Sequence, residues 1–141
     1  MIQLILCTGL IFCSTDSLQM PMKISDRIFS FTPKLFHHPQ RVLFNSRTFD
    51  LEVFSDFPRE SVQSISLFYK TDTVPRYQEI PFDLHKKRFS YRYNPRKYPA
   101  NKITYFFTIN LTNGELYGTP VDSVGQLLPV TKYLWDPREY Y

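Results

Sequence analysis

Between residues 40 and 120 the chain consists of short runs in which apolar and polar residues alternate, and turn-forming residues separate these runs. Alternation with a period of two is typical of a β-strand that buries one face. The clearest run covers residues 102–110, where Ile103, Tyr105, Phe107 and Ile109 share one face. The predicted strands are residues 41–44, 48–55, 62–70, 77–82, 89–93, 102–110 and 115–119. About seven short strands separated by turns predict an all-β fold, an antiparallel β-sandwich.

The proline and aromatic content favours the same fold class. The 11 prolines leave little room for long helices, whereas turns and edge strands accept them, and Pro81 falls in a predicted strand that suits a sheet edge. No predicted strand is followed by an amphipathic stretch of helix length, which argues against parallel α/β folds. Aromatic residues make up 17% of the chain, so even a small sandwich can bury a sizeable core. The alternation places in this core Phe49, Leu51, Ile65, Leu67, Tyr91, Tyr105 and Phe107.

The first 13 residues form an uncharged apolar run of signal-peptide length, too short to span a bilayer comfortably. Residues 1–18 are therefore predicted to be an export leader, although no basic residue precedes the run. The alternatives are a lipoprotein leader and a buried N-terminal element of the domain. Leu10-Ile11-Phe12-Cys13 resembles the lipoprotein pattern, with Cys13 as the lipidated residue, but Phe12 stands where a small residue is expected. Either leader predicts export to the periplasm, the outer surface or the medium, with membrane association only through the leader.

Turn residues divide the rest of the chain. Residues 19–39 are predicted to be a connector, because prolines at positions 21, 33 and 39 break any regular period. Residues 40–120 form the predicted sandwich, and residues 121–141 form a C-terminal tail in which the strand pattern is lost. The tail ends in aromatic residues that either dock back on the sandwich or lead elsewhere: Tyr133, Trp135, Tyr140 and Tyr141.

The sequence contains no nucleophile elbow, phosphate-binding loop, dinucleotide fingerprint or zinc-protease motif. His37 and His38 are adjacent, so on a strand they would point to opposite sides and could not easily share a metal ion; we expect them to be solvated. A serine or cysteine triad lacks a convincing base, because the predicted sandwich offers only His85, which lies in a basic turn. Residues 110–112 form an N-glycosylation sequon that matters only in a eukaryotic secretory route. We therefore expect no enzyme activity, no metal and no cofactor.

The densest basic region runs from His85 to Arg88, with Arg92, Arg96 and Lys97 nearby. It either meets phosphate or sulfate groups or is a solvated turn that keeps an aromatic-rich protein soluble. Binding of nucleic acid would require stacking aromatics interleaved with basic residues on one open face. The aromatic residues of this region are expected in the core instead, so no nucleic-acid partner is predicted.

Three segments resemble bacterial immunoglobulin-like or fibronectin type III-like extracellular domains. They are residues 65–72 (Ile-Ser-Leu-Phe-Tyr-Lys-Thr-Asp), residues 77–82, and residues 103–120 with the Asn113-Gly114 turn and Thr119-Pro120. The resemblance implies an immunoglobulin-like sandwich in which the Tyr105 hydroxyl makes a corner hydrogen bond that pins its strand. It implies little about function, because such sandwiches carry many unrelated roles.

These observations favour a non-catalytic interaction or structural module with a protein or envelope-glycan partner; the alternative is a carbohydrate-binding or enzyme-accessory module. The candidate binding residues are Phe68, Phe106 and Tyr117, which strand parity directs outward on three neighbouring strands of one sheet. A contiguous aromatic band of this kind usually marks a contact. The alternative is that the band is an internal seam, covered by residues 121–141 or by the apolar residues 28–31.

Overall fold

The computed structural model describes residues 34–141. The predicted leader, Cys13, residues 28–31 and most of the predicted connector lie outside these residues. The described strands are β1 (Leu35–Phe36), β2 (Leu43–Phe44), β3 (Phe49–Ser55), β4 (Val62–Thr71), β5 (Gln78–Pro81), β6 (Phe89–Tyr93), β7 (Lys102–Leu111), β8 (Leu116–Thr119) and β9 (Val130–Trp135). A 3-10 turn, η1 (Arg59–Ser61), precedes β4, and one helical turn, α2 (Pro137–Tyr140), follows β9.

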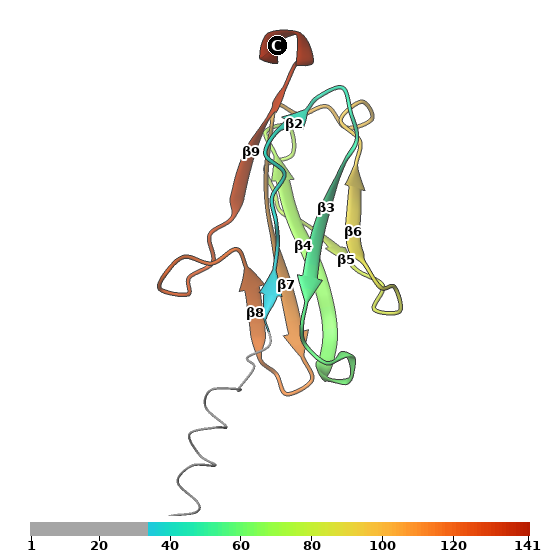
Figure 1. Cartoon of the computed structure of the whole chain (residues 1–141), viewed down its shortest axis with the longest axis vertical. Helices are drawn as coiled ribbons and strands as arrows, with labels where there is room; N and C mark the ends of the chain where they lie inside the picture. Colours follow the sequence, from blue (N-terminus) through green and yellow to red (C-terminus); the bar gives the residue numbers. More distant parts are fainter. Residues whose placement is uncertain (1–33) are drawn as a thin grey trace, which may run out of the picture. The chain divides into compact units, whose positions relative to one another are not determined.

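These strands form two sheets that pack face to face as a sandwich, which confirms the predicted fold class (Figure 1). The smaller sheet has the order β1-β3-β6, and the larger has the order β2-β9-β7-β4-β5, with β8 also paired to β7. Neighbouring strands run antiparallel, except that β2 and β9 run parallel.

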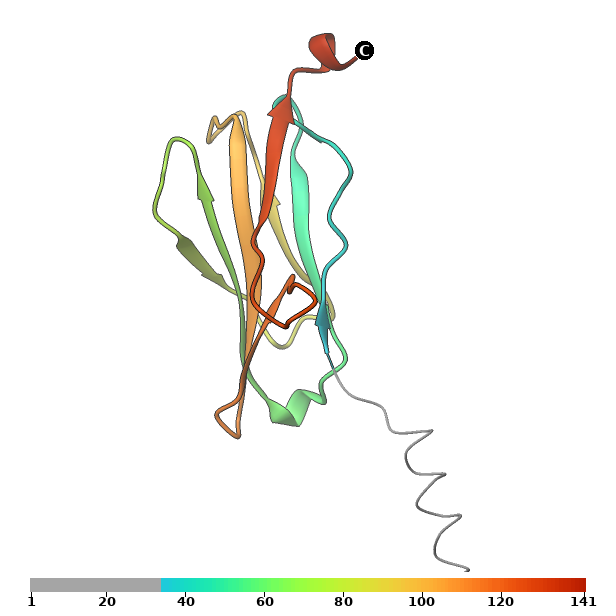
Figure 2. The same cartoon turned by 90° about the vertical axis from the view of Figure 1, so that its left-hand side faces the viewer.

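Two strands lie in segments that the sequence pattern assigned to the connector and the tail. Leu35 pairs with Ser55, so β1 belongs to the smaller sheet. Lys102 pairs with Tyr133, so β9 extends the larger sheet beside β7 (Figure 2). The sandwich in the described residues therefore runs from Leu35 to Trp135. A strand of two residues is too short to show alternation, and β9 is joined to its partner only through long-range pairing, so neither carried a clear local signal.

The core lies between the sheets and follows the alternation of the longest strands. On β4 and β7, every second side chain points inward and is buried. Six of the seven predicted core residues are buried: Phe49, Leu51, Ile65, Leu67, Tyr105 and Phe107. Tyr91 also faces inward but is only half-buried, while Tyr93, two positions further along β6, is 2% exposed. The exposure of Tyr91 shows that the sandwich is incompletely filled near β6.

On one side of the sandwich, the edge strands are β5 in the larger sheet and β6 in the smaller sheet. Within the described chain, β5 pairs only with β4, and β6 pairs only with β3. Pro81 lies in β5, an outer strand, as the sequence predicted, because a strand edge does not require the missing backbone N–H. Gln78 of β5 and Tyr91 of β6 line a common cavity between these two edge strands.

Candidate functional site

The structure brings together two of the three predicted binding residues. Phe68 and Phe106 lie opposite each other in the β4–β7 register, and their rings stack with centroids 5.1 Å apart and planes 9° apart. Tyr77 packs edge-on against Phe106 at 5.2 Å, and the Lys70 ammonium lies 4.7 Å from the Tyr77 ring. Both phenylalanines are half-buried. Tyr77, rather than the C-terminal segment, partly covers this stacked pair, since β9 extends the sheet at its edge.

Tyr117 lies on the opposite face of the same sheet. It pairs with Ile109, which is buried, and its ring contacts Phe57 at 5.3 Å. Tyr117 faces this side because the hairpin loop between β7 and β8 has three residues. The loop is closed by a hydrogen bond from Leu111 N to Glu115 O. A two-residue loop over Asn113-Gly114 would have shifted the register by one and turned Tyr117 outward. The predicted three-residue aromatic band therefore does not form.

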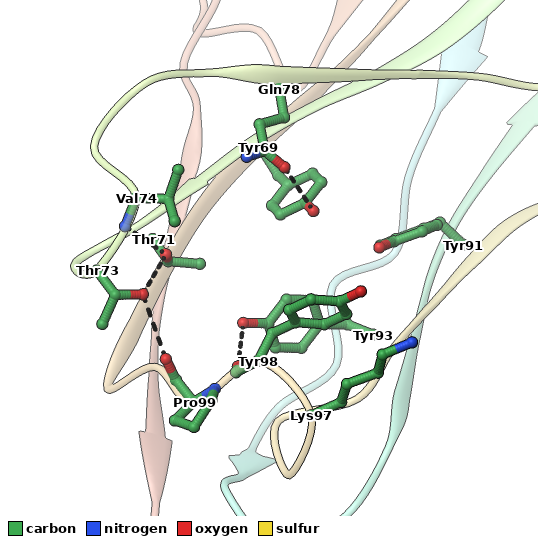
Figure 3. Close-up of a pocket in the computed structure, with 10 residues that line it drawn as sticks. All are labelled: Tyr69, Thr71, Thr73, Val74, Gln78, Tyr91, Tyr93, Lys97, Tyr98 and Pro99. Atoms are coloured by element: carbon green, nitrogen blue, oxygen red, sulfur yellow. Dashed lines mark hydrogen bonds between the residues drawn. The ribbon is translucent and has the colours of Figure 1, made fainter.

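A cavity opens at the side of the sandwich where β5 and β6 form the sheet edges, between β4, β5 and β6. It has a volume of about 570 Å³, which lies within the usual range for small-ligand sites. Figure 3 shows its aromatic side chains arranged around an open centre. Its lining residues are Tyr69, Thr71, Thr73, Val74, Gln78, Tyr91, Tyr93, Lys97, Tyr98 and Pro99.

The aromatic side chains that line this cavity are four tyrosines, and we call it the tyrosine cavity. Strand geometry positions three of them. Tyr69 faces inward on β4, and Tyr91 and Tyr93 face inward on β6. The Tyr69 ring stacks on Tyr91 with centroids 5.6 Å apart and meets Tyr93 edge-on at 6.1 Å. Tyr98 comes from the loop between β6 and β7 and is 52% exposed. The cavity thus combines rings fixed by the sheets with one ring accessible from solvent.

Hydrogen bonds fix the walls of the tyrosine cavity. The Tyr93 hydroxyl donates to the carbonyl oxygen of Tyr98 at 2.6 Å, which ties the β6–β7 loop to the strand before it (Figure 3). The Thr73 hydroxyl donates to the carbonyl oxygen of Pro99 at 3.2 Å, which joins the β4–β5 loop to the same segment. The Tyr69 hydroxyl donates to Gln78 Oε1 at 3.0 Å. Both loops at the mouth are therefore held in place before any ligand arrives.

The cavity is electrostatically simple. Burial raises the pKa of the Tyr69 hydroxyl, and the neighbouring Tyr91 raises it further; burial also raises the pKa of Tyr93. Both hydroxyls therefore stay protonated at neutral pH. Among the lining residues, Lys97 carries a charge and none is a carboxylate. The cavity can stack a ring and donate hydrogen bonds, and Lys97 gives its lining one positive charge.

His37 is half-buried against the core rather than solvated, whereas His38 is exposed as expected. Its Nδ1 donates to the carbonyl oxygen of Glu52 at 2.5 Å, so its Nε2 accepts from the Tyr105 hydroxyl at 2.9 Å. The ring also packs against Phe107 at 5.0 Å. Burial lowers the pKa of His37. The Tyr105 hydroxyl, for which the resemblance implied a corner bond, thus fastens the segment after β1 to β7.

No group of three or more metal-binding side chains occurs within residues 34–141. Sequence reasoning missed the tyrosine cavity because it assigned Tyr91 to a closed core and gave Tyr98 no role. One signal in the sequence could have indicated the cavity: several tyrosines occupy inward positions near a predicted edge strand. Buried tyrosine hydroxyl groups require hydrogen-bond partners, so such positions are less suited to a closed apolar core.

No protein-family model matches the chain, and no curated protein matches it. Within the described part of the chain, no helix is long and apolar enough to cross a membrane.

Proposed function

We propose that this chain is a non-catalytic interaction module of the immunoglobulin-like type, carried by an exported protein. The strand arrangement supports the immunoglobulin-like assignment. In the seven-stranded form of that fold, one sheet contains the first, second, fourth and fifth strands and the other contains the third, sixth and seventh. Here β1, β3 and β6 form one sheet, and β4, β7 and the final strands β8 and β9 lie in the other. The strand that follows β4, β5, pairs with β4 in this larger sheet instead of joining the smaller one, and β2 pairs with β9. Export rests on the predicted leader in residues 1–18.

The tyrosine cavity is the binding site of this module. The observation that carries the proposal is that four tyrosine rings surround a solvent-accessible cavity whose loops are already held by hydrogen bonds. Tyrosine provides a large rigid contact surface with a polar tip and loses little conformational entropy on binding, which is why binding surfaces are rich in it. A site with fixed loops also avoids the entropy cost of ordering them on binding.

The partner is a protein or an envelope glycan. A protein partner agrees with the open strand edge beside the cavity, because an extended chain can lie along it. A carbohydrate-binding or accessory role is the second candidate, and the exposed Tyr98 ring favours it, because an exposed ring can stack on the apolar face of a sugar while nearby hydroxyls hydrogen-bond to it.

The test compares the wild-type protein with the double variant Tyr91→Ala/Tyr98→Ala on a random peptide display library and on a glycan array. We expect ligands selected by the wild type to bind the double variant at least about tenfold more weakly, since two ring contacts are lost. Tyr133→Ala is the matched control, because Tyr133 is 62% exposed on β9 and is not part of the cavity. Ligands that bind all three proteins equally would exclude the tyrosine cavity as the binding site.

A further inference from the structure

The outer edge of β6 is open to pairing within the described residues. β6 pairs with β3 on one side, and no described strand pairs with the other side. Such an edge presents unpaired backbone N–H and C=O groups that another extended chain can bind. Proteins usually block these edges with proline, a bulge or a charged side chain. The neighbouring edge strand β5 carries Pro81, whereas β6 contains no proline and pairs with β3 without a register shift.

The two arginines at β6 do not block its edge, because both turn back over β3. Arg88 Nε lies 2.7 Å from Glu52 Oε1, and Arg92 Nε lies 3.0 Å from Asp50 Oδ1. Each guanidinium also places a second nitrogen near the same carboxylate. These pairs direct the long side chains away from the free edge and leave the backbone groups of β6 accessible.

A strand added to this edge would place its side chains on two different surfaces. Side chains alternate along a strand, and on β6 the inward set includes Tyr91 and Tyr93, which line the tyrosine cavity. The outward set includes Ser90 and Arg92. Every second side chain of the added strand would therefore enter the cavity, where an aromatic group can stack on tyrosine. The others would lie on the outer face of the smaller sheet.

The charges at both ends of β6 select an acidic partner. Lys86 and Lys87 precede the strand, Arg96 and Lys97 follow it, and all four are exposed without an ion pair to a described residue. The carboxylates on the adjacent strand β3 are already paired with arginines. Asp83 adds one negative charge to the turn before β6, where it accepts a hydrogen bond from the His85 backbone. The excess positive charge remains at both ends.

We propose that the free edge of β6 binds an extended acidic peptide segment of a partner protein as an additional strand. Acidic side chains of the peptide face the basic ends of β6, and an aromatic side chain enters the tyrosine cavity. This inference rests on the proposed function, because it names the partner class for the same cavity. The positive charge at both ends of β6 also increases the rate at which an acidic segment finds the edge.

The probe is a fluorescent synthetic peptide of about nine residues in which glutamate alternates with phenylalanine, long enough to cover β6 and both flanks at about 3.3 Å per residue. Fluorescence anisotropy gives its dissociation constant. We expect the corresponding peptide with lysine in place of glutamate to bind at least about tenfold more weakly. Two further peptides carry N-methyl groups on alternate backbone amides. One peptide is methylated at the odd-numbered amides and the other at the even-numbered amides. An added strand uses only one set of amides, so one methylated peptide should lose binding while the other retains it.

On the protein, reversing the four basic residues should weaken binding about tenfold and reduce its dependence on salt. The variant is Lys86→Glu/Lys87→Glu/Arg96→Glu/Lys97→Glu, and the control is Arg41→Glu/Arg138→Glu, which changes charge away from β6. Equal binding of acidic and basic peptides, equal binding of both methylated peptides, or no binding at millimolar concentration would overturn the proposal. If Tyr91→Ala/Tyr98→Ala still abolishes binding of library ligands in any of these cases, strand addition is wrong while the cavity keeps its proposed function.

Discussion

Replacing Phe107 with alanine tests the packing of the sandwich most directly. Phe107 is fully buried on β7, with its ring centroid 5.0 Å from His37, 5.9 Å from Tyr105 and 6.3 Å from Phe82. Returning the ring to water on unfolding accounts for about 2–3 kcal/mol. The cavity left between two paired sheets adds to this, so we expect the free energy of unfolding to fall by about 3–5 kcal/mol.

The assay is denaturant unfolding followed by circular dichroism, with thermal unfolding as a second measurement. For a folded unit of about 100 residues, this loss corresponds to a decrease of about 12–20 °C in the melting temperature. The matched control is Phe68→Ala on the outer face of β4, whose half-buried ring should contribute less than about 2 kcal/mol. A cost below about 1 kcal/mol for Phe107→Ala would refute the inward assignment of β7 and the packing derived from it.

Three further predictions concern single contacts. Burial holds the pKa of His37 below its ordinary value of 6.5, so the unfolded chain binds a proton at a higher pH than the folded chain. The free energy of unfolding should therefore fall as the pH decreases below about 6.5. His37→Gln should reduce this pH dependence in denaturant titrations at several pH values. Tyr93→Phe removes the hydrogen bond to Tyr98 O and should lower the unfolding free energy by about 1 kcal/mol and speed hydrogen exchange in the β6–β7 loop; unchanged exchange would contradict this role. Gly114→Ala should destabilise by about 1–2 kcal/mol, measured by thermal unfolding, because Gly114 has φ of +88°; no loss would mean that the hairpin takes another form.

The sequence predicted those parts of the fold that have a local signal. Alternation along β4 and β7 identified the inward residues, because long strands with one buried face must follow a period of two. β1 and β9 lacked such a signal: β1 has two residues, and only Leu134 is buried on β9. Their place depends on pairing with distant strands, which local composition does not specify.

The candidate site was harder to predict, because it depends on register and on loops. A difference of one residue in the β7–β8 loop length reversed the direction of Tyr117. The tyrosine cavity depends on which strand edges remain unpaired and on where Tyr98 is held by Tyr93, and both are tertiary features. Sequence alternation correctly placed Tyr91 inward, but it does not reveal whether an inward position is filled or open.

The parallel pairing of β2 with β9 determines how the sandwich responds to mechanical force. Leu43 pairs with Leu134 and Phe44 with Trp135, and Asn45 N donates to Trp135 O at 3.0 Å. Because the strands run in the same direction, tension on the segment before β2 and on the segment after β9 pulls them past each other. The hydrogen bonds between them are then loaded together in shear rather than opened one at a time. The β2–β9 pair therefore resists sliding of these two strands within the larger sheet when the segments before β2 and after β9 are pulled apart.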